Sequence, residues 1–270
     1  MFKPIKHLGQ NFLTSKKIAE DIVNAADIKP DDIVLEAGPG KGILTELLLK
    51  KAKKVIAIEK DKRLVKFLET KFSDSIKVST LSVINDDILK FDPTTHNLQP
   101  TNYKIVANIP YYITSRFLRK FLSGAHQPTL MVLMVQKEVA ERIIAKDGKE
   151  SLLSISIKAY GKPEIVKRVS AGNFSPKPKV DSAIIKISQI SKNFFKDLHP
   201  ASPLLRGRSK EGAEKLFFEL VKKGFSQKRK MLINNLKCGP EIFAKCCLSP
   251  KTRAENLSLE DWGCLTNCQG

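Results

Sequence analysis

The segment Ile33-Val-Leu-Glu-Ala-Gly38-Pro-Gly40-Lys-Gly42-Ile43 decides the fold. Its apolar first half predicts a short buried strand, and its three alternating glycines predict a tight turn that lets the backbone approach a ligand closely. Apolar residues at helical spacing follow from Ile43 to Ala52, so the turn opens a helix. A glycine-rich turn between a strand and a helix is typical of α/β folds that bind nucleotides or related cofactors.

The same strand–helix unit recurs along the chain. Further strands are expected at 55–59, 76–85, 104–108 and 130–135, and helices at 16–26, 60–72, 115–123, 136–146 and 151–160. Two last strands, at 165–170 and 182–187, follow each other without a helix and predict an antiparallel edge. The pattern predicts an α/β fold with a mostly parallel, doubly wound sheet of seven strands.

Beyond about residue 190 only helical patterns remain, at 211–223, 227–236, 240–247 and from Leu259 onward. We therefore expect an α/β domain at residues 1–191 and a small all-helical domain at residues 192–270. The five cysteines show no Cys-x-x-Cys spacing. They predict buried free thiols, with neither a disulfide nor a metal site.

Composition restricts the class of partner. Apolar residues make up 42% of the chain and charged residues 28%, a balance that argues against disordered, collagen-like and coiled-coil proteins. The net charge of +19 predicts a polyanionic partner, although a generally basic, solvated surface is the alternative. No apolar run approaches the roughly 20 residues of a membrane helix. The amino terminus lacks a signal-peptide pattern, so we expect a cytoplasmic protein without a membrane partner.

Polar residues at four strand ends predict a ligand site. Gly38, Glu59, Asp87 and Asn108 each stand at or just past a predicted strand, at the edge where open parallel sheets bind ligands. Glu59 follows Gly38 by 21 residues, where a carboxylate can accept hydrogen bonds from ribose hydroxyls. The alternative for Glu59 is an ordinary solvated carboxylate. The Gly-x-Gly-x-Gly spacing disfavours a pyrophosphate, whereas the S-adenosylmethionine cation tolerates nearby carboxylates such as Glu36.

Asn108-Ile-Pro-Tyr111 is the most specific motif. The Asn108 amide oxygen and a backbone carbonyl of the turn at Pro110 can accept hydrogen bonds from an exocyclic amine. Tyr111 would stack on the base, and Phe174, in the proline-rich loop, is the candidate for a second stacking ring. For both rings the alternative is ordinary anchoring of a loop in the core.

A series of motifs runs in order over nearly the whole chain. They are Gly9-Gln-Asn-Phe-Leu13, Glu36-Ala-Gly-Pro-Gly40, Asn108-Ile-Pro-Tyr111, Gln136-Lys-Glu-Val139, the segment from Phe174 to Ser182, Gln227-Lys-Arg-Lys230 and Arg253-Ala-Glu-Asn-Leu257. Together they resemble the ribosomal RNA adenine N6-dimethyltransferases, and the last two favour the small-subunit type. The resemblance implies a Rossmann-like class I methyltransferase that dimethylates N6 of two adjacent adenosines near the 3′ end of small-subunit ribosomal RNA.

The same resemblance assigns roles to individual residues. Gln10, Asn11 and Leu13 would border the methionine part of S-adenosylmethionine, with Gly38 and Gly40 beneath it. Glu59 would bind the ribose and Asp87 the adenine amine, with their neighbours Lys60 and Ile88 beside them. Asn108 would touch both cofactor and target, and it forms the catalytic group with Pro110 and Tyr111. No metal is expected.

The resemblance also implies the partner, an immature small ribosomal subunit bound by a monomer. Lys228, Arg229 and Lys230 would contact RNA phosphates. Alternatively, they form the polar face of a helix whose Met231, Leu232 and Leu236 pack inward. Three other functions stay open on the sequence. They are an assembly or transcription factor without catalysis, a nicotinamide oxidoreductase and a DNA adenine methylase.

Overall fold

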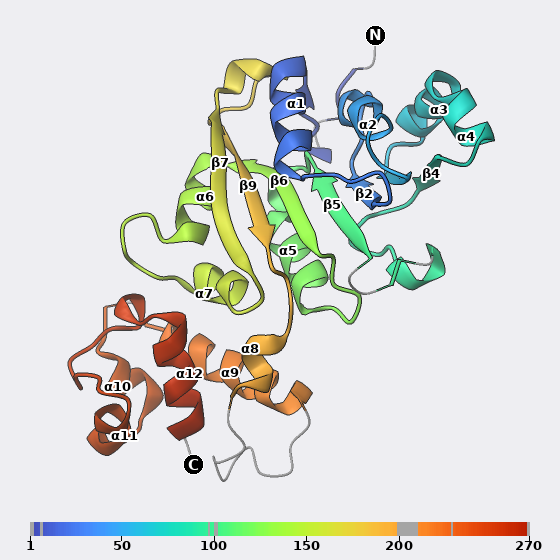
Figure 1. The fold of residues 1–270 in the computed structure, drawn as a ribbon. Coiled ribbons are helices and arrows are strands. Elements are labelled where there is room, and N and C mark those ends of the chain that lie inside the picture. The colour runs from blue at the N-terminus through green and yellow to red at the C-terminus, as the bar shows by residue number, and fades with distance from the viewer. Residues whose placement is uncertain are drawn as a thin grey trace. The chain divides into compact units, whose positions relative to one another are not determined.

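The computed structural model describes residues 3–5, 8–96, 98–99, 102–198, 210–227 and 229–268. The chain divides into two compact units (Figure 1). The first unit comprises Met1–Ala140 and Lys162–Ile190, and the second comprises Glu141–Gly161 and Ser191–Gly270. The second unit thus takes in residues 141–161, which the sequence had assigned to the α/β domain.

A seven-stranded sheet forms the centre of the first unit. Its strands are β2 (Ile33–Ala37), β3 (Lys54–Glu59), β4 (Leu81–Asn85), β5 (Tyr103–Ala107), β6 (Leu130–Gln136), β7 (Lys162–Val169) and β9 (Ser182–Ser188). Their order is β4-β3-β2-β5-β6-β9-β7. All neighbours are parallel except the pairs that involve β9, which are antiparallel. The predicted fold class, with its antiparallel edge, is confirmed.

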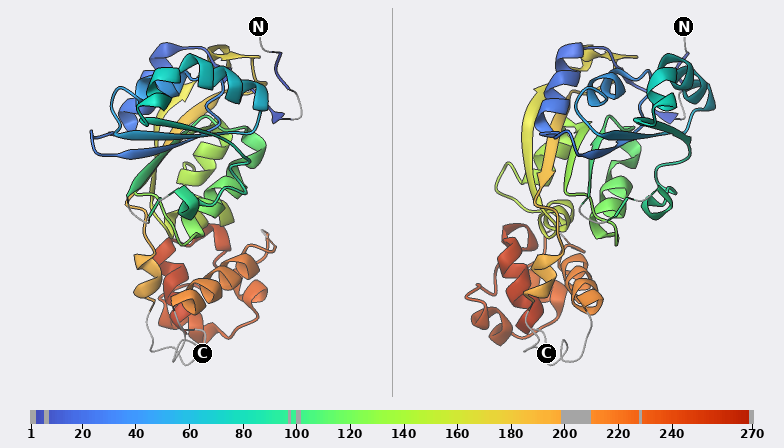
Figure 2. Two further views of the ribbon diagram at one scale, coloured as in Figure 1. Left: turned by 90° about the vertical axis from the view of Figure 1, so that its right-hand side faces the viewer. Right: turned by 45° about the vertical axis from the view of Figure 1, so that its right-hand side comes forward.

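Both faces of the sheet are buried, which explains its almost continuous apolar strands. Alternate residues such as Val34, Val106 and Val132 belong to a core cluster shared with the helices near the amino terminus. Their neighbours, such as Leu35 and Ile105, are equally buried and point to the opposite face. Figure 2 shows helices on both sides of the strands. In the first unit these helices are α1 (Lys16–Ala25), α2 (Ile43–Leu48), α3 (Lys62–Lys71), α4 (Ser73–Lys77) and α5 (Thr114–Ser123). The helix α6 (Lys137–Ile144) begins in the first unit directly after β6 and continues into the second.

The predicted start of the strand at 76–85 is wrong. Residues Ser73–Lys77 form the short helix α4, and the strand begins only at Leu81. Ser79 between them has a left-handed backbone (φ 61°) that turns the chain. Ile76 packs against the core from the helix. Its apolar side chain therefore suited a helix as well as a strand, and packing decided between them.

Two short strands that the sequence did not predict join distant loops. β1 (Phe12–Leu13) pairs with β8 (Phe174–Ser175) in antiparallel register, Leu13 opposite Phe174. The Thr14 backbone N–H also donates to the Asn173 carbonyl at 2.9 Å. The amino-terminal segment is thereby held against the proline-rich loop of the same unit.

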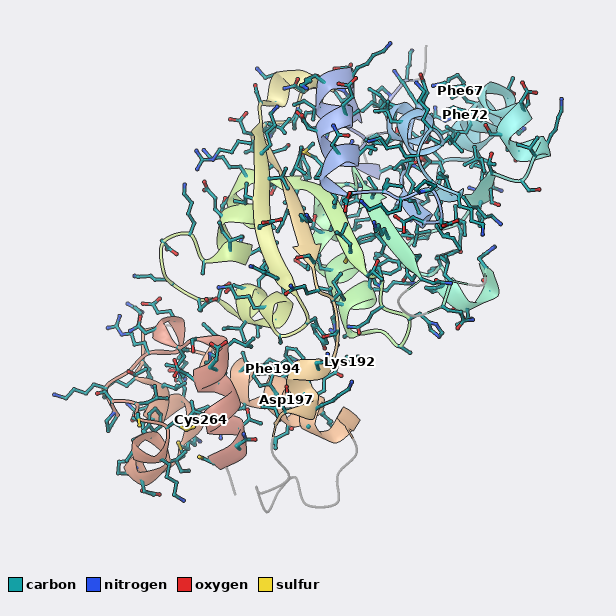
Figure 3. The ribbon with its side chains drawn as sticks, viewed as in Figure 1. Phe67, Phe72, Lys192, Phe194, Asp197 and Cys264 are labelled. Atoms are coloured by element: carbon teal, nitrogen blue, oxygen red, sulfur yellow. A yellow bond between two sulfur atoms is a disulfide. The ribbon has the colours of Figure 1, made fainter. Side chains whose placement is uncertain are left out.

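The second unit is helical. Its elements are α7 (Leu152–Lys158), α8 (Asn193–Lys196), α9 (Lys210–Gly224), α10 (Leu232–Leu236), α11 (Pro240–Lys245) and α12 (Leu259–Cys268). Aromatic rings pack at its centre, and Phe194, labelled in Figure 3, meets Phe217 edge-on with ring centroids 5.1 Å apart. Across the described residues, no helix is both long and apolar enough to cross a membrane.

The expected helix at 227–236 is shorter than its pattern suggested. It begins at Leu232, and Met231 has an extended backbone at its N-cap. Arg229 and Lys230 therefore lie in the turn before α10. Leu232 and Leu236 are buried as expected, but Met231 is 40% exposed, so its expected inward packing is wrong. Lys228 lies outside the described residues.

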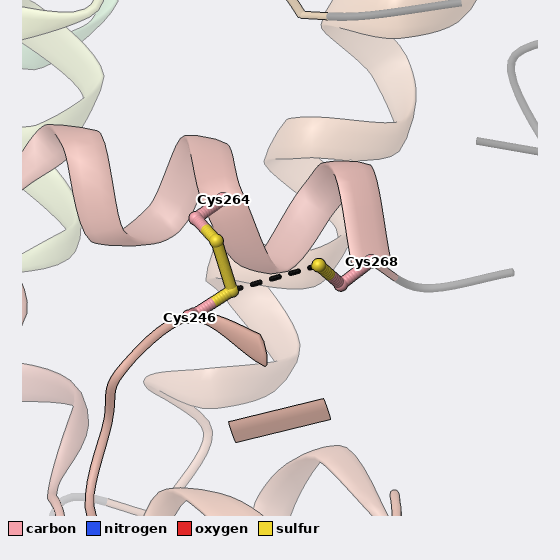
Figure 4. Close-up of side chains that lie close together, drawn as sticks. All are labelled: Cys246, Cys264 and Cys268. Carbon is pink, nitrogen blue, oxygen red and sulfur yellow. Dashed lines mark hydrogen bonds between the residues drawn. A yellow bond between two sulfur atoms is a disulfide. The ribbon is translucent and has the colours of Figure 1, made fainter. Parts of the chain in front are cut away.

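The expectation of free thiols without a disulfide is also wrong. Cys246 and Cys264 form a disulfide, with Cα atoms 5.8 Å apart (Figure 4). The two residues are 18 positions apart. Only the packing of the end of α11 against α12 brings them together, and no local spacing pattern reveals such a contact.

Gly42 offers a test of the glycine turn that precedes α2. It has φ 77°, and a Cβ atom there would lie 2.6 Å from the ring of Phe72, which Figure 3 labels. Gly42→Ala should lower the free energy of unfolding by about 2–4 kcal/mol, because a left-handed backbone and an overpacked core both cost free energy.

Gly38→Ala is the matched control. Gly38 has φ 67°, but a Cβ atom would meet only the Asn108 carbonyl oxygen at an ordinary 3.7 Å. Urea unfolding should show a loss of about 1–2 kcal/mol for this variant. Equal losses in the two variants would show that contact with Phe72 does not matter.

Candidate active site

A cavity of about 250 Å³ lies at the carboxyl ends of the parallel strands in the first unit. Its wall is formed by the ends of β2, β3, β4 and β5 together with the amino-terminal segment 8–13. The predicted residues on this wall are Gln10, Asn11, Leu13, Gly38, Gly40, Glu59, Lys60, Asp87, Ile88, Asn108, Pro110 and Tyr111. Phe174 is not among the lining residues. These residues lie together because the parallel register of the strands aligns strand ends that are far apart in sequence.

Glu59 is held against the glycine turn. Its carboxylate accepts hydrogen bonds from the backbone N–H groups of Gly40 (3.1 Å) and Asp61 (2.9 Å). The side chain is 6% exposed, and burial raises its pKa despite these bonds. Each carboxylate oxygen retains a lone pair, so the group can also accept hydrogen bonds from hydroxyl groups in the cavity.

Asp87 forms an ion pair with Lys60, whose Nζ lies 2.8 Å from Asp87 Oδ2. The other oxygen of Asp87 accepts the Leu89 backbone N–H at 3.0 Å. Burial opposes the charge of Asp87, but the hydrogen bonds from Lys60 and Leu89 outweigh it and lower its pKa. A fixed carboxylate of this kind can accept a hydrogen bond from an amine.

Asn108 is oriented by the amino-terminal segment. Its Nδ2 donates to the Asn11 carbonyl at 3.2 Å. The amide nitrogen is thus engaged, and Oδ1 is the atom that can accept a hydrogen bond from a ligand. Two positions on, the Pro110 carbonyl accepts the Ile113 N–H at 3.1 Å, which leaves it one lone pair. These acceptors can hold the N–H groups of an exocyclic amine.

The two predicted stacking rings have different environments. The Tyr111 hydroxyl lies 2.6 Å from Ser182 Oγ on β9, and burial raises its pKa, so the phenol stays protonated. Tyr111 lines the cavity. Phe174 is only 4% exposed and belongs to the core cluster. It occupies the position that core anchoring predicts, and its stacking on a base stays a prediction.

Comparison with known proteins identifies the family. The sequence matches the family model of ribosomal RNA adenine dimethylases over residues 1–268. This chain belongs to the ribosomal RNA adenine dimethylase family. It is 44% identical to the ribosomal RNA small subunit methyltransferase A of Dehalococcoides mccartyi, covering 96% of this chain and 86% of the relative. The protein of the same name in Clostridium perfringens is 38% identical, over 98% of this chain and 90% of the relative.

Solved structures agree with this dimethylase fold. A dimethyladenosine transferase from Plasmodium falciparum superimposes with a TM-score of 0.74 at 30% identity, covering 94% of this chain and 95% of the other. The 23S rRNA methyltransferase ErmE superimposes with a TM-score of 0.74 at 27% identity, over 96% of this chain and 99% of the other.

Two further side chains lie on the cavity wall of the dimethylase. Tyr112, which the sequence already associates with the pocket wall as a departure from the family pattern, lines the cavity and is 55% exposed. Arg116 of α5 also lines the cavity, and the sequence did not single it out. An arginine five positions after Tyr111, at the start of the predicted helix, was the available signal. Gln10, in contrast, binds mainly protein, since it donates to Asp61 at 3.0 Å and accepts the Ile5 N–H at 2.8 Å.

Glu36 is a buried acid directly beneath the glycine turn of the dimethylase. It is 0% exposed, and the Thr45 hydroxyl of α2 donates to its Oε2 at 2.7 Å. Its Oε1 has no hydrogen-bond partner in the described part of the chain. Burial is the main cause that raises the pKa of Glu36 to about 8, with a smaller contribution from the charge of Glu59. At neutral pH Glu36 is therefore mostly protonated.

This pKa predicts a pH-dependent stability. Between the ordinary pKa of 4.5 and about 8, the folded protein binds more protons at Glu36 than the unfolded chain does. The contribution of Glu36 is therefore full below pH 4.5 and is lost as the pH rises to about 8. The parental protein should therefore lose unfolding free energy as the pH rises from 4.5 to about 8. In Glu36→Gln, which carries no titrating group at this position, that loss should be smaller by on the order of 1–4 kcal/mol.

Urea unfolding at several pH values measures this difference. Glu20→Gln, at an exposed position of α1, is the control and should keep the parental pH profile. An unchanged profile in Glu36→Gln would show that Glu36 is ionised in the folded protein.

Proposed function

We propose that this dimethylase uses S-adenosylmethionine to dimethylate N6 of two adjacent adenosines near the 3′ end of small-subunit ribosomal RNA. The supporting observation is that Glu59, Asp87 and the Asn108–Tyr111 motif line one cavity. The name shared by the bacterial relatives supports the small subunit as the source of the RNA.

The residues present fit S-adenosylmethionine. Glu59 would hold the ribose hydroxyls and Asp87 the adenine amine, each through an anchored carboxylate. Asn11, Leu13 and the turn at Gly38 would border the methionine part. The wall carries three acidic and three basic side chains, a balance that suits a zwitterionic ligand better than a polyphosphate. When bound, the cofactor supplies a methyl group on an electrophilic sulfonium sulfur.

The protein's own contribution is alignment of the target amine. Asn108 Oδ1 and the remaining Pro110 lone pair would accept its two N–H groups, which turns the nitrogen lone pair toward the methyl donor. Tyr111, fixed through Ser182, would stack on the extruded adenine and exclude water. A general base with a shifted pKa is not needed, because a methylated ring-bound ammonium nitrogen loses its proton readily.

The remaining proposals concern the cellular setting. We place the enzyme as a monomer on immature small subunits, in the cytoplasm where these subunits assemble. The enzyme could also assist assembly of the small subunit without catalysis, through the same basic residues that would contact RNA. A nicotinamide oxidoreductase is excluded by the family assignment.

Asn108→Ala tests the proposed role of the amide. Loss of an amine-orienting acceptor should slow methyl transfer more than about tenfold. Tritium transfer from labelled S-adenosylmethionine into immature small subunits measures the rate under single-turnover conditions. Mass spectrometry of the RNA then shows whether the product is N6,N6-dimethyladenosine at two neighbouring positions.

Asn102→Ala is the control for this variant. Asn102 is exposed just before β5, at the end opposite Asn108, so the rate should stay unchanged. A parental rate in Asn108→Ala would remove the assigned role. Absence of dimethyladenosine with the parental protein would refute the proposed function.

Salt dependence tests the proposed phosphate contacts of Arg229 and Lys230, which are exposed. In the double variant Arg229→Ala/Lys230→Ala, the slope of log affinity against log salt should become shallower by about 1.4–1.8, because two counterion-releasing contacts are lost. Fluorescence anisotropy with a ribosomal RNA fragment measures the slope. The charge-keeping variant Arg229→Lys/Lys230→Arg should retain it, and a parental slope in the alanine variant would contradict the phosphate contacts.

A further inference from the structure

Three cysteine sulfurs gather in the second unit, and the methyl-transfer proposal uses none of them. Cys246 directly follows α11, whereas Cys264 and Cys268 belong to α12. The three Sγ atoms all lie within 4.8 Å of one another (Figure 4). Because Cys264 and Cys268 are four residues apart, they share one face of the helix, the face that Cys246 approaches.

We propose that these three cysteines form a Zn²⁺ site when the Cys246–Cys264 disulfide is reduced. Tetrahedral zinc with bonds to sulfur of about 2.3 Å places its sulfur ligands about 3.8 Å apart. The Sγ atoms of Cys246 and Cys268 are already 3.7 Å apart. Opening the disulfide lets Cys264 move to a similar distance by side-chain rotation, because its position on α12 is already within reach.

The donor set selects the kind of metal. The cluster contains only sulfur, with no carboxylate or imidazole among the described residues that compose it. Thiolates favour zinc and other thiophilic ions over Mg²⁺ or Ca²⁺, which require oxygen ligands. Three protein ligands leave the fourth position of zinc for a water molecule.

The two states of the cluster are chemically exclusive. A dithiol reductant gives two electrons and two protons to the disulfide, becomes a disulfide itself and leaves Cys246 and Cys264 as thiols. Together with Cys268 they bind Zn²⁺ as three thiolates and release three protons. Both the disulfide and the zinc would join the end of α11 to α12. The cross-link is therefore kept in either redox state, and only the reduced state holds metal.

Zinc binding by the full-length protein tests this proposal. The chain is reduced with a phosphine, which does not bind zinc as a thiol would, and titrated with Zn²⁺ against a chromogenic chelator under anaerobic conditions. We expect one zinc per reduced chain and none per oxidised chain. Cobalt as a spectroscopic substitute should give the sulfur-to-cobalt charge-transfer absorption of a thiolate site.

Cys268→Ser is the decisive variant, because it removes the third ligand and leaves the disulfide pair intact. It should weaken zinc binding at least about tenfold, since loss of even an indirect partner of a metal ligand costs that much. Cys247→Ser is the matched control: Cys247 is exposed and adjacent to Cys246 but outside the cluster. It should bind zinc like the parent.

Circular dichroism of the oxidised Cys268→Ser protein verifies that the fold is retained. Parental zinc affinity in Cys268→Ser would overturn the proposal, as would equal weakening in Cys247→Ser. The absence of stoichiometric zinc in the reduced parent would overturn it as well.

Discussion

Parallel pairing of β2 with β3 and β5 is the constraint on which the active site depends. In this register Ala37 lies opposite both Ile58 and Ala107. The three strands therefore end side by side at the same edge of the sheet. The next residue of each strand lies at this edge, so residues far apart in sequence come close together: Gly38, Glu59 and Asn108. Because β2 lies where the strand order reverses, loops diverge on either side and leave room for a cavity.

The same burial that fixes the strands sets the electrostatics of the site. Glu36 and Glu59 lie at and near the ends of strands with both faces covered, so both carboxyl groups are desolvated and their pKa values rise. Glu59 keeps backbone N–H donors that favour its charged form. Glu36 accepts one hydroxyl hydrogen bond, and its other oxygen has no partner among the residues that the structure describes. The first suits a ligand-binding carboxylate, and the second serves as a mostly neutral link between β2 and α2.

The sequence allowed prediction of those features that depend on local pattern. Apolar runs ending in Gly38, Glu59 and Asn108 located both the strands and the polar edge, because buried parallel strands have a distinctive composition. Features that depend on contacts between distant segments could not be predicted from the sequence. Ile76 fits a strand or a helix equally well, and the contact between Cys246 and Cys264 exists only after α11 and α12 pack.

The position of Phe174, close to the candidate site, also could not be predicted from local sequence pattern. Its position in a proline-rich loop was compatible with stacking or with the core, and the pairing of β8 with β1 places it in the core cluster. Through this pairing it lies opposite Leu13, a residue of the cavity wall. Loss of its packing would therefore displace the segment that carries Asn11, whose carbonyl orients Asn108. A core residue can in this way control the orientation of the Asn108 side chain.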